Sequence, residues 1–441
     1  MRQVLYVNIY PIRKEVLKMA RTITPKDACA IMNLLVKEAI GADAQIQAVD
    51  SSTFVSAGET VLATGTENVL NALSIVLGRT FMAVRPYKAK LGIINAIDTG
   101  LYTNRMRKIS FYDEESQASG AWNTDLYTNI ADGFDNGSNP NAGGTAQSVG
   151  TMWEQHLYQP IEMNFAGQSV WDFNITVPEV QLQIAFRSPE EFAAFISGMM
   201  TKHGNDIEKT KEAFNRMTLL NKIAGCYSLT ASMPGTVVNL TKAFNDEYGT
   251  SYSSDDLRTT YIKEFLAFFV EKFKLETEKM TYDTTMYHWT PANSGNKTLS
   301  RHTSFADQRV LLYEPLFIKS KAQVLPEIFN PQYLDINTQY EPVLFWQNWN
   351  DPAKIKTKPA IPNVSNPAQQ TAPGSAVTIP YVVGIVFDRD AMMTDFQYES
   401  SDTTPLEARK KYRNIWFHCS KNAINDFTEN TIIFIMEDPS T

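Results

Sequence analysis

The chain has 441 residues, of which 43% are hydrophobic and 11% aromatic. That supply of apolar side chains supports one large domain or two to three lobes with real cores, and it excludes an intrinsically disordered chain. The 40 basic and 48 acidic residues leave a formal net charge of -8. This charge disfavours a dedicated nucleic-acid-binding protein, although it is compatible with a local basic face that contacts nucleic acid.

The chain carries no sequence signal for disulfides, secretion or a membrane span. Its three cysteines are far apart and odd in number, which favours reduced thiols over a disulfide framework or a CxxC metal site. They are Cys29, Cys226 and Cys419. No stretch approaches the ~18 apolar residues of a transmembrane helix, and no signal-peptide cleavage site follows the basic start. Met19 lies just before a clean helix start, so we expect residues 1–18 to be upstream translation or a disordered tail.

The N-terminal part of the chain is predicted to consist of short elements. A helix over residues 24–41 is favoured by Thr24 as its N-cap and Pro25 at its first position. After it the pattern predicts extended runs at 54–55 and 61–63, a helix at 67–77, and extended runs at 80–84 and 90–94.

An outward strand, a long polar segment and a returning strand are predicted next. Residues 107–112 alternate as a strand does, and residues 113–150 are rich in Gly, Asn, Ser, Thr and Asp. Apolar residues then recur at alternate positions across 165–186, which predicts extended structure. A long two-stranded excursion with a polar tip follows from this order.

The clearest local signal is the start of a long helix. Ser188-Pro189-Glu190-Glu191 combines an N-cap, a proline at the first helical position and first-turn carboxylates. Apolar residues continue at helical spacing to about residue 225, with a kink or interruption expected at 203–205. Without interruption the helix would span roughly 54 Å, well beyond the usual globular length.

The rest of the chain mixes helices and strands without βαβα alternation, which predicts an α+β fold. We expect helices at 255–275 and 319–329, and strands at 310–313, 381–387, 412–419 and 431–436. The Pro-rich segment 351–380 is expected to lack regular structure.

Motifs that carry chemistry are scarce. The five histidines show no metal-type spacing, and no phosphate loop, dinucleotide motif or nucleophile elbow is present. Asp388 and Asp390 could hold a divalent metal at a strand end, but a solvated turn is the favoured interpretation. Glu190 and Glu191 are better explained by the helix start than as an acid/base pair. We therefore predict no catalytic, cofactor-binding or metal-binding residues.

Tryptophans offer one alternative function. A sugar-binding platform could be formed by Trp122, Trp153, Trp171, Trp346 and Trp349. Core or subunit contacts are the favoured use, because aromatic residues are enriched in buried interfaces.

The order of these elements resembles the Hong Kong ninety-seven fold of tailed-bacteriophage major capsid proteins. More local resemblance to small phage and gut-phage capsid proteins is carried by residues 53–91, 301–335 and 409–436. The resemblance implies the following division: an N-terminal arm (19–106), an extended loop (107–187), a spine helix of the peripheral domain (188–225), an axial domain (226–395, with an insertion at 351–380) and C-terminal strands that return to the peripheral domain (396–441).

The same resemblance implies a structural, non-enzymatic subunit of an icosahedral head that encloses double-stranded DNA. Expected partners are copies of itself in pentamers and hexamers, scaffolding and portal proteins, and packaged DNA without sequence specificity, but no membrane. Assembly in the bacterial host cytoplasm and residence in the virion capsid are expected. The residues expected to support assembly are Trp122, Tyr127, Trp153, Trp171, Phe192, Phe195, Phe214 and Leu220.

Two alternatives remain. An encapsulin-like compartment shares the implied fold and would enclose an enzyme. An enzyme or carbohydrate-binding protein with a distributed site would use Trp153, Trp171, Trp346 or Trp349 with Asp388 and Asp390.

Overall fold

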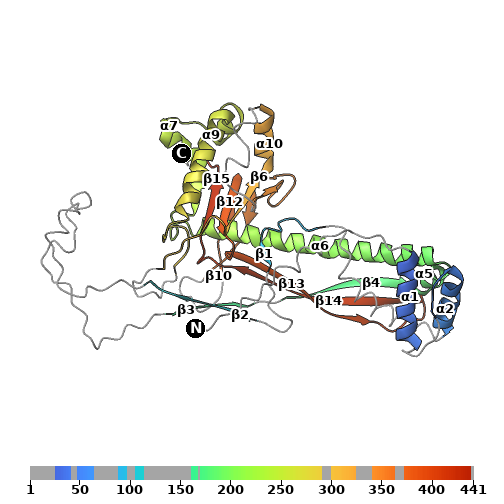
Figure 1. Ribbon diagram of the computed structural model, residues 1–441. Coiled ribbons are helices and arrows are strands. Elements are labelled where there is room, and N and C mark those ends of the chain that lie inside the picture. Colours follow the sequence, from blue (N-terminus) through green and yellow to red (C-terminus); the bar gives the residue numbers. More distant parts are fainter. Residues whose placement is uncertain are drawn as a thin grey trace, which may run out of the picture.

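The described residues form a long arm, along which one long helix runs, and a lobe at one end of it (Figure 1). The computed structural model describes residues 25–40, 47–63, 88–96, 105–113, 160–166, 169–290, 299–323, 340–362 and 372–438. Helices and strands are mixed along the chain without regular alternation, which confirms the predicted α+β fold class.

The arm consists of a four-stranded sheet with a long helix beside it. The strands lie in the order β1 (Asn95–Ala96), β13 (Met392–Thr403), β14 (Tyr412–Asn425) and β4 (Ser169–Pro178), and α6 (Pro189–Ser228) runs along them. β13, β14 and β4 are antiparallel, whereas β1 is parallel to β13. Strand β13 was not predicted, and residues 90–94 form turns that lead into β1 rather than an extended run.

Helix α6 begins as its sequence predicts. Ser188 is the N-cap and its hydroxyl accepts a hydrogen bond from the Glu191 backbone N–H at 3.1 Å, with proline at the first position. The helix continues through 203–205 to Ser228, so the expected interruption is wrong. Burial of His203 against the sheet accounts for the continuity, because tertiary packing outweighs weak local propensity.

Short helices surround the start of α6 at the far end of the arm. They are α1 (Pro25–Ile40), α2 (Ser51–Ala63) and α5 (Glu179–Ala185), and they pack there around Phe54, Phe186 and Phe192. The extended runs expected at 54–55 and 61–63 are wrong, because Asp50 accepts a hydrogen bond from the Thr53 N–H and starts a helix. The alternation within 180–184 likewise belongs to a helix.

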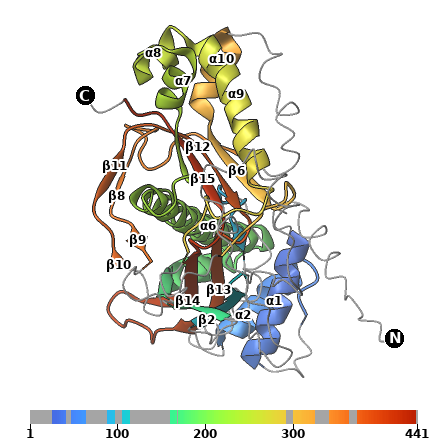
Figure 2. The ribbon, with the colours of Figure 1, turned by 90° about the vertical axis from the view of Figure 1, so that its left-hand side faces the viewer.

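The lobe is built on a five-stranded sheet covered by helices. Its strands lie in the order β5 (Val237–Asn239), β15 (Thr431–Ile435), β12 (Val382–Asp388), β6 (Gln308–Tyr313) and β7 (Tyr340–Val343). Packed near them are α7 (Leu240–Tyr248), α8 (Ser254–Thr259), α9 (Ile262–Lys279) and α10 (Glu314–Gln323) (Figure 2). The helix expected at 255–275 is thus two helices, and the one expected at 319–329 starts earlier.

Close packing of the central strands explains a glycine in this sheet. A Cβ atom on Gly384 of β12 would collide with the side chain of Leu312 on β6. The last strand, β15, pairs with β12 in the lobe. Residues 396–441 therefore do not all return to the arm, contrary to the expected division, because the fully apolar β15 is buried in the core of the lobe.

The Pro-rich segment forms two small sheets, so the expected lack of regular structure is wrong. Strand β8 (Ile355–Thr357) pairs with β11 (Val377–Ile379), and β9 (Ala360–Ile361) pairs with β10 (Ala372–Pro373). Prolines are tolerated because these strands are short and lie in two-stranded ribbons, where many N–H groups need no strand partner.

The predicted excursion is confirmed in its outward strand, but the returning strand expected at 165–186 is mostly wrong, because that range contains β4, which pairs with β14, and α5. Strand β2 (Arg105–Phe111) pairs antiparallel with β3 (Pro160–Ala166), and Phe111 lies opposite Pro160. The expected polar tip, the helix at 67–77, the run at 80–84 and the end of the helix expected at 319–329 lie outside the described residues.

Candidate functional site

The β2–β3 hairpin has two chemically different faces. Alternate residues of β2 point to opposite sides, and Lys108, Ser110 and the buried Tyr112 face the body of the protein. On the other face Ile109 and Phe111 are 51% and 55% exposed. One face therefore holds the hairpin in place, and the other presents apolar side chains outward.

A buried cluster of charges holds the hairpin at its base. The Lys108 ammonium makes ion pairs with the carboxylates of Asp426 and Glu429, which lie in the connection between β14 and β15. The Asp426 side chain is fully buried, and that of Lys108 is 23% exposed. Because 318 residues separate Lys108 from Asp426, this contact exists only in the folded chain.

Helix α6 joins the same cluster. Lys222 of α6 is fully buried and its ammonium donates a hydrogen bond to the Asp426 backbone carbonyl at 2.5 Å. The ammonium also lies 4.6 Å from the centre of the Phe427 ring. Hairpin, spine helix and lobe thus meet at residue 426.

A second cation closes the cluster from the other side. Arg301 donates to the Ser110 hydroxyl at 2.8 Å and lies 3.6 Å from the Glu429 carboxylate. The Ser300 N–H donates to the Asp113 carboxylate at 2.6 Å. Contacts of Lys108, Ser110 and Asp113 therefore fix the hairpin at three points and not at one.

Burial and charge act in opposite directions on these groups. Burial alone would raise the pKa of Asp426, but Lys108 and hydrogen bonds from Thr428 outweigh it and lower that pKa. For Glu429 burial prevails and raises its pKa, although Lys108 opposes it. Burial also lowers the pKa of Lys222. Within the cluster, the ion pair of Lys108 with Asp426 thus offsets the cost of burying a charge most fully.

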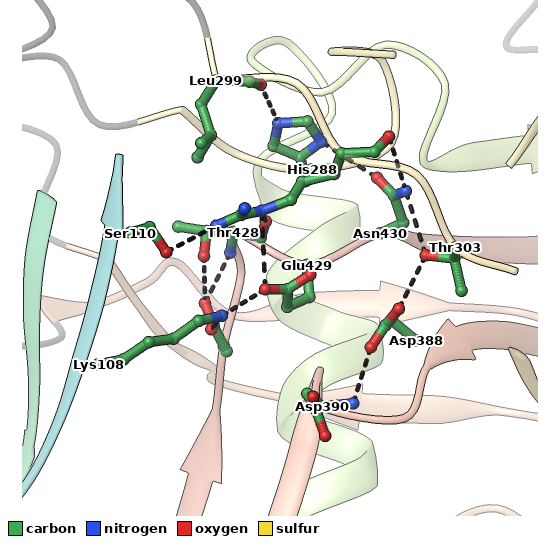
Figure 3. A network of polar contacts seen from close by, with 12 residues as sticks. Lys108, Ser110, His288, Leu299, Thr303, Asp388, Asp390, Thr428, Glu429 and Asn430 are labelled. Atoms are coloured by element: carbon green, nitrogen blue, oxygen red, sulfur yellow. Dashed lines mark hydrogen bonds and ion pairs between the residues drawn. The ribbon is translucent and has the colours of Figure 1, made fainter. Parts of the chain in front are cut away.

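Polar contacts continue from this cluster into the lobe, as Figure 3 shows. His288 contacts the Asn430 side chain at 3.1 Å and the Leu299 carbonyl at 2.6 Å. The Asn430 amide donates to the Thr303 hydroxyl, which in turn donates to the Asp388 carboxylate. Such a network holds the loops around β12 and β15 in fixed positions.

Four predicted assembly residues lie on α6. Phe192 is fully buried, with the ring centres of Phe54 in α2 and of Phe186 in the turn after α5 at 5.6 and 5.3 Å, so its contacts are not with the sheet alone. Phe195 is half-buried in the same cluster. Leu220, also half-buried, packs against the core of the lobe.

Phe214 connects the spine helix to the sheet through a cation. The Lys421 ammonium of β14 lies 4.7 Å from the centre of the Phe214 ring and 3.0 Å from that of Trp171 on β4. Trp171 itself is 42% exposed. The remaining predicted assembly residues, Trp122, Tyr127 and Trp153, lie outside the described residues.

Two tryptophans of the alternative sugar site differ in burial, and Trp122 and Trp153 lie outside the described residues. Trp346 is fully buried and its indole N–H donates to the Val382 carbonyl at 2.9 Å, whereas Trp349 is 66% exposed. Asp388 closes a turn by accepting the Asp390 N–H at 2.8 Å, as the favoured interpretation predicted. Trp346 therefore cannot serve as a sugar platform.

Metal clusters and membrane-spanning helices are both absent from the described ranges. Within them no three His, Cys, Asp or Glu side chains are grouped so that they could hold a metal ion. None of the helices found there combines the length and apolarity of a bilayer span. Cys29, Cys226 and Cys419 are all buried.

Sequence reasoning missed the charged cluster. Its members are single charges in otherwise ordinary segments, and only Asp426, Thr428 and Glu429 are close in sequence. A usable signal was Lys222, a lysine on the apolar side of an amphipathic helix, since buried lysines require a partner.

Comparison with known proteins adds the family. Residues 151–435, nearly two thirds of the chain, match the family model of the Phi29-like phage major capsid protein. The chain is similar to the capsid structure of Staphylococcus phage Andhra at 10% identity, with a TM-score of 0.47 and coverage of 81% of this chain and 86% of that one. It is also similar to the capsid structure of Cyanophage P-SCSP1u at 10% identity, with a TM-score of 0.40 and coverage of 81% of this chain and 90% of that one. No curated protein sequence matches the chain.

Proposed function

Because the chain belongs to the family of Phi29-like phage major capsid proteins and so builds the phage head from copies of itself, we propose that the β2–β3 hairpin is the element that reaches a neighbouring copy. The observation that carries this proposal is the two-faced hairpin. Its inner face is fixed by Lys108, while Ile109 and Phe111 on its outer face are exposed. A second copy would bury this apolar surface.

The copies form pentamers and hexamers of an icosahedral shell that holds double-stranded DNA. Head-to-tail contacts that close into rings suit a long hairpin on one side of a subunit and a receiving surface on the other. Many weak contacts of this kind stabilise a shell collectively. Assembly takes place in the host cytoplasm, with scaffolding and portal proteins as further partners.

The proposed capsid domains correspond to the arm and the lobe of the fold. The part of residues 107–187 that precedes β4 acts as the extended loop, and residues 188–225 act as the spine of a peripheral domain, which also contains the sheet of β13, β14 and β4. Residues 226–395 together with β15 form the axial domain, and 351–380 are an insertion in it. Trp171, Phe192, Phe195, Phe214 and Leu220 support assembly indirectly, by keeping the arm rigid.

Sedimentation and negative-stain electron microscopy of the purified, overexpressed chain test the proposal. We expect closed shells, tubes or ring-shaped capsomers. A monomer that remains monomeric with and without a candidate scaffolding protein would contradict it. Deletion of residues 115–150 is expected to give folded subunits, checked by circular dichroism, that do not close shells. Normal shells from this deletion would refute the role of the hairpin.

A further inference from the structure

A local basic stripe interrupts the acidic character of the chain. Lys354, Lys356 and Lys358 are exposed and alternate with the buried Ile355 and the half-buried Thr357. Ile355 pairs with Ile379 of β11, and both side chains are fully buried. The buried face of this small sheet thus fixes the opposite face, which carries the lysines, toward solvent.

One residue of the stripe, Lys358, also lines an open groove beside α6. The groove has a volume of about 680 Å³ and lies between α6 and the segment that contains β8 and β9. Figure 2 shows these strands running past α6. Lining residues from α6 include Lys209, Arg216 and Leu220, and those from the strands include Thr357 and Lys358.

The lysines of the stripe are available to an external anion. Within the described part of the chain, no carboxylate forms an ion pair with Lys354, Lys356 or Lys358. The one carboxylate that lines the groove, Glu212, is paired with Arg216 at 3.0 Å. Asp351, which is exposed, is the nearest acidic residue in the sequence of the stripe.

An aromatic stack stands beside the stripe. The Arg216 guanidinium lies 3.8 Å from the centre of the Phe345 ring, whose centre is 4.3 Å from that of Trp349. The neighbouring Gln347 holds the Lys356 backbone through hydrogen bonds of 2.7 and 2.9 Å. Lys356 is therefore held within the ordered strand β8, and Lys354 and Lys358 directly precede and follow that strand.

We propose that the stripe of Lys354, Lys356 and Lys358, the last of which also lines the groove, binds the phosphate backbone of double-stranded DNA without reading its bases, an inference that rests on the proposed role of the shell as a DNA container. Every second residue of a strand recurs at roughly 6.6 Å, a spacing comparable with that of successive phosphates along one DNA strand. Cations without protein partners release counterions from DNA when they bind it.

The test is the salt dependence of DNA binding by the full-length, unassembled subunit. Fluorescence anisotropy of a labelled 20-base-pair duplex is followed between about 50 and 200 mM salt, a range over which phosphate contacts weaken strongly. The variant Lys354→Gln/Lys356→Gln/Lys358→Gln is compared with a control of equal charge. The control, Lys242→Gln/Lys263→Gln/Lys274→Gln, changes three exposed lysines on α7 and α9.

Each lost phosphate contact lowers the slope of log K against log salt by about 0.9. We expect the stripe variant to lose about 2.7 from the slope and the control to lose less than about 1. An unchanged slope in the stripe variant, or equal losses in both, would overturn the proposal. So would stripe-dependent binding of a labelled polyglutamate peptide that is tighter than that of the duplex, which would assign the groove to an acidic peptide.

Shell formation separates this inference from the function on which it rests. All three proteins are examined by negative-stain electron microscopy, and all are expected to form shells. Wild-type protein that forms no shells counts against the proposed function. Shells from all three with no stripe-dependent DNA binding count against the groove alone.

Discussion

Acidification should weaken the arm through one buried histidine. His203 of α6 is 4% exposed and packs between the rings of Phe417 at 4.4 Å and Phe173 at 5.7 Å. Burial lowers its pKa to about 4, although the Asp206 carboxylate opposes the shift. In the unfolded chain its pKa returns to about 6.5. The folded state therefore holds this histidine neutral over a range in which the unfolded state binds a proton.

The sign and size of the effect follow from this difference. The folded pKa is depressed, so the contribution is fully present above pH 6.5 and is lost as the pH falls towards 4. Between pH 7.5 and 5.0 the free energy of unfolding should fall by about 2 kcal/mol from this group alone. Below pH 4 the loss approaches about 3.4 kcal/mol.

Urea unfolding of the unassembled subunit, followed by intrinsic fluorescence at pH 7.5 and 5.0, measures this loss. The variant His203→Phe keeps an aromatic ring but cannot titrate, so its pH dependence should be smaller by about 2 kcal/mol. His302→Gln is the control, because His302 is exposed, and it should behave as the wild type. A His203→Phe variant with the wild-type pH dependence would refute the argument.

Two substitutions test the joints of the fold. Lys108→Met should weaken attachment of the hairpin by about 3–5 kcal/mol, because it removes a counter-charge from the fully buried carboxylate of Asp426. Hydrogen exchange over residues 105–113 should therefore rise. The control is Arg107→Met, which alters an exposed ion pair with Glu162, and a similar rise in this control would contradict the prediction. Phe192→Ala should cost about 3–5 kcal/mol in urea unfolding, since the side chain is fully buried. Phe195→Ala should cost less, and an equal or larger loss would count against the assigned packing.

Much of the fold was predictable because its signals are local. The start of α6 follows from Ser188 and Pro189, which cap a helix within one turn. The strands β2 and β12 follow from alternating or continuous apolar residues, and the order of these elements led to the correct family. Where local signals were ambiguous, as in α2 and α5, short apolar runs fitted both helix and strand, and contact with α6 decided the outcome.

The junction that holds the hairpin was decided only by tertiary structure. Lys108, Lys222 and Asp426 lie on three elements far apart in sequence, and each is an unremarkable charge by itself. A charge becomes a structural determinant only when burial removes water and leaves another charge as its partner. The sequence determined the helices and strands through local capping and periodicity, while the folded chain alone determined which distant charges share one buried site.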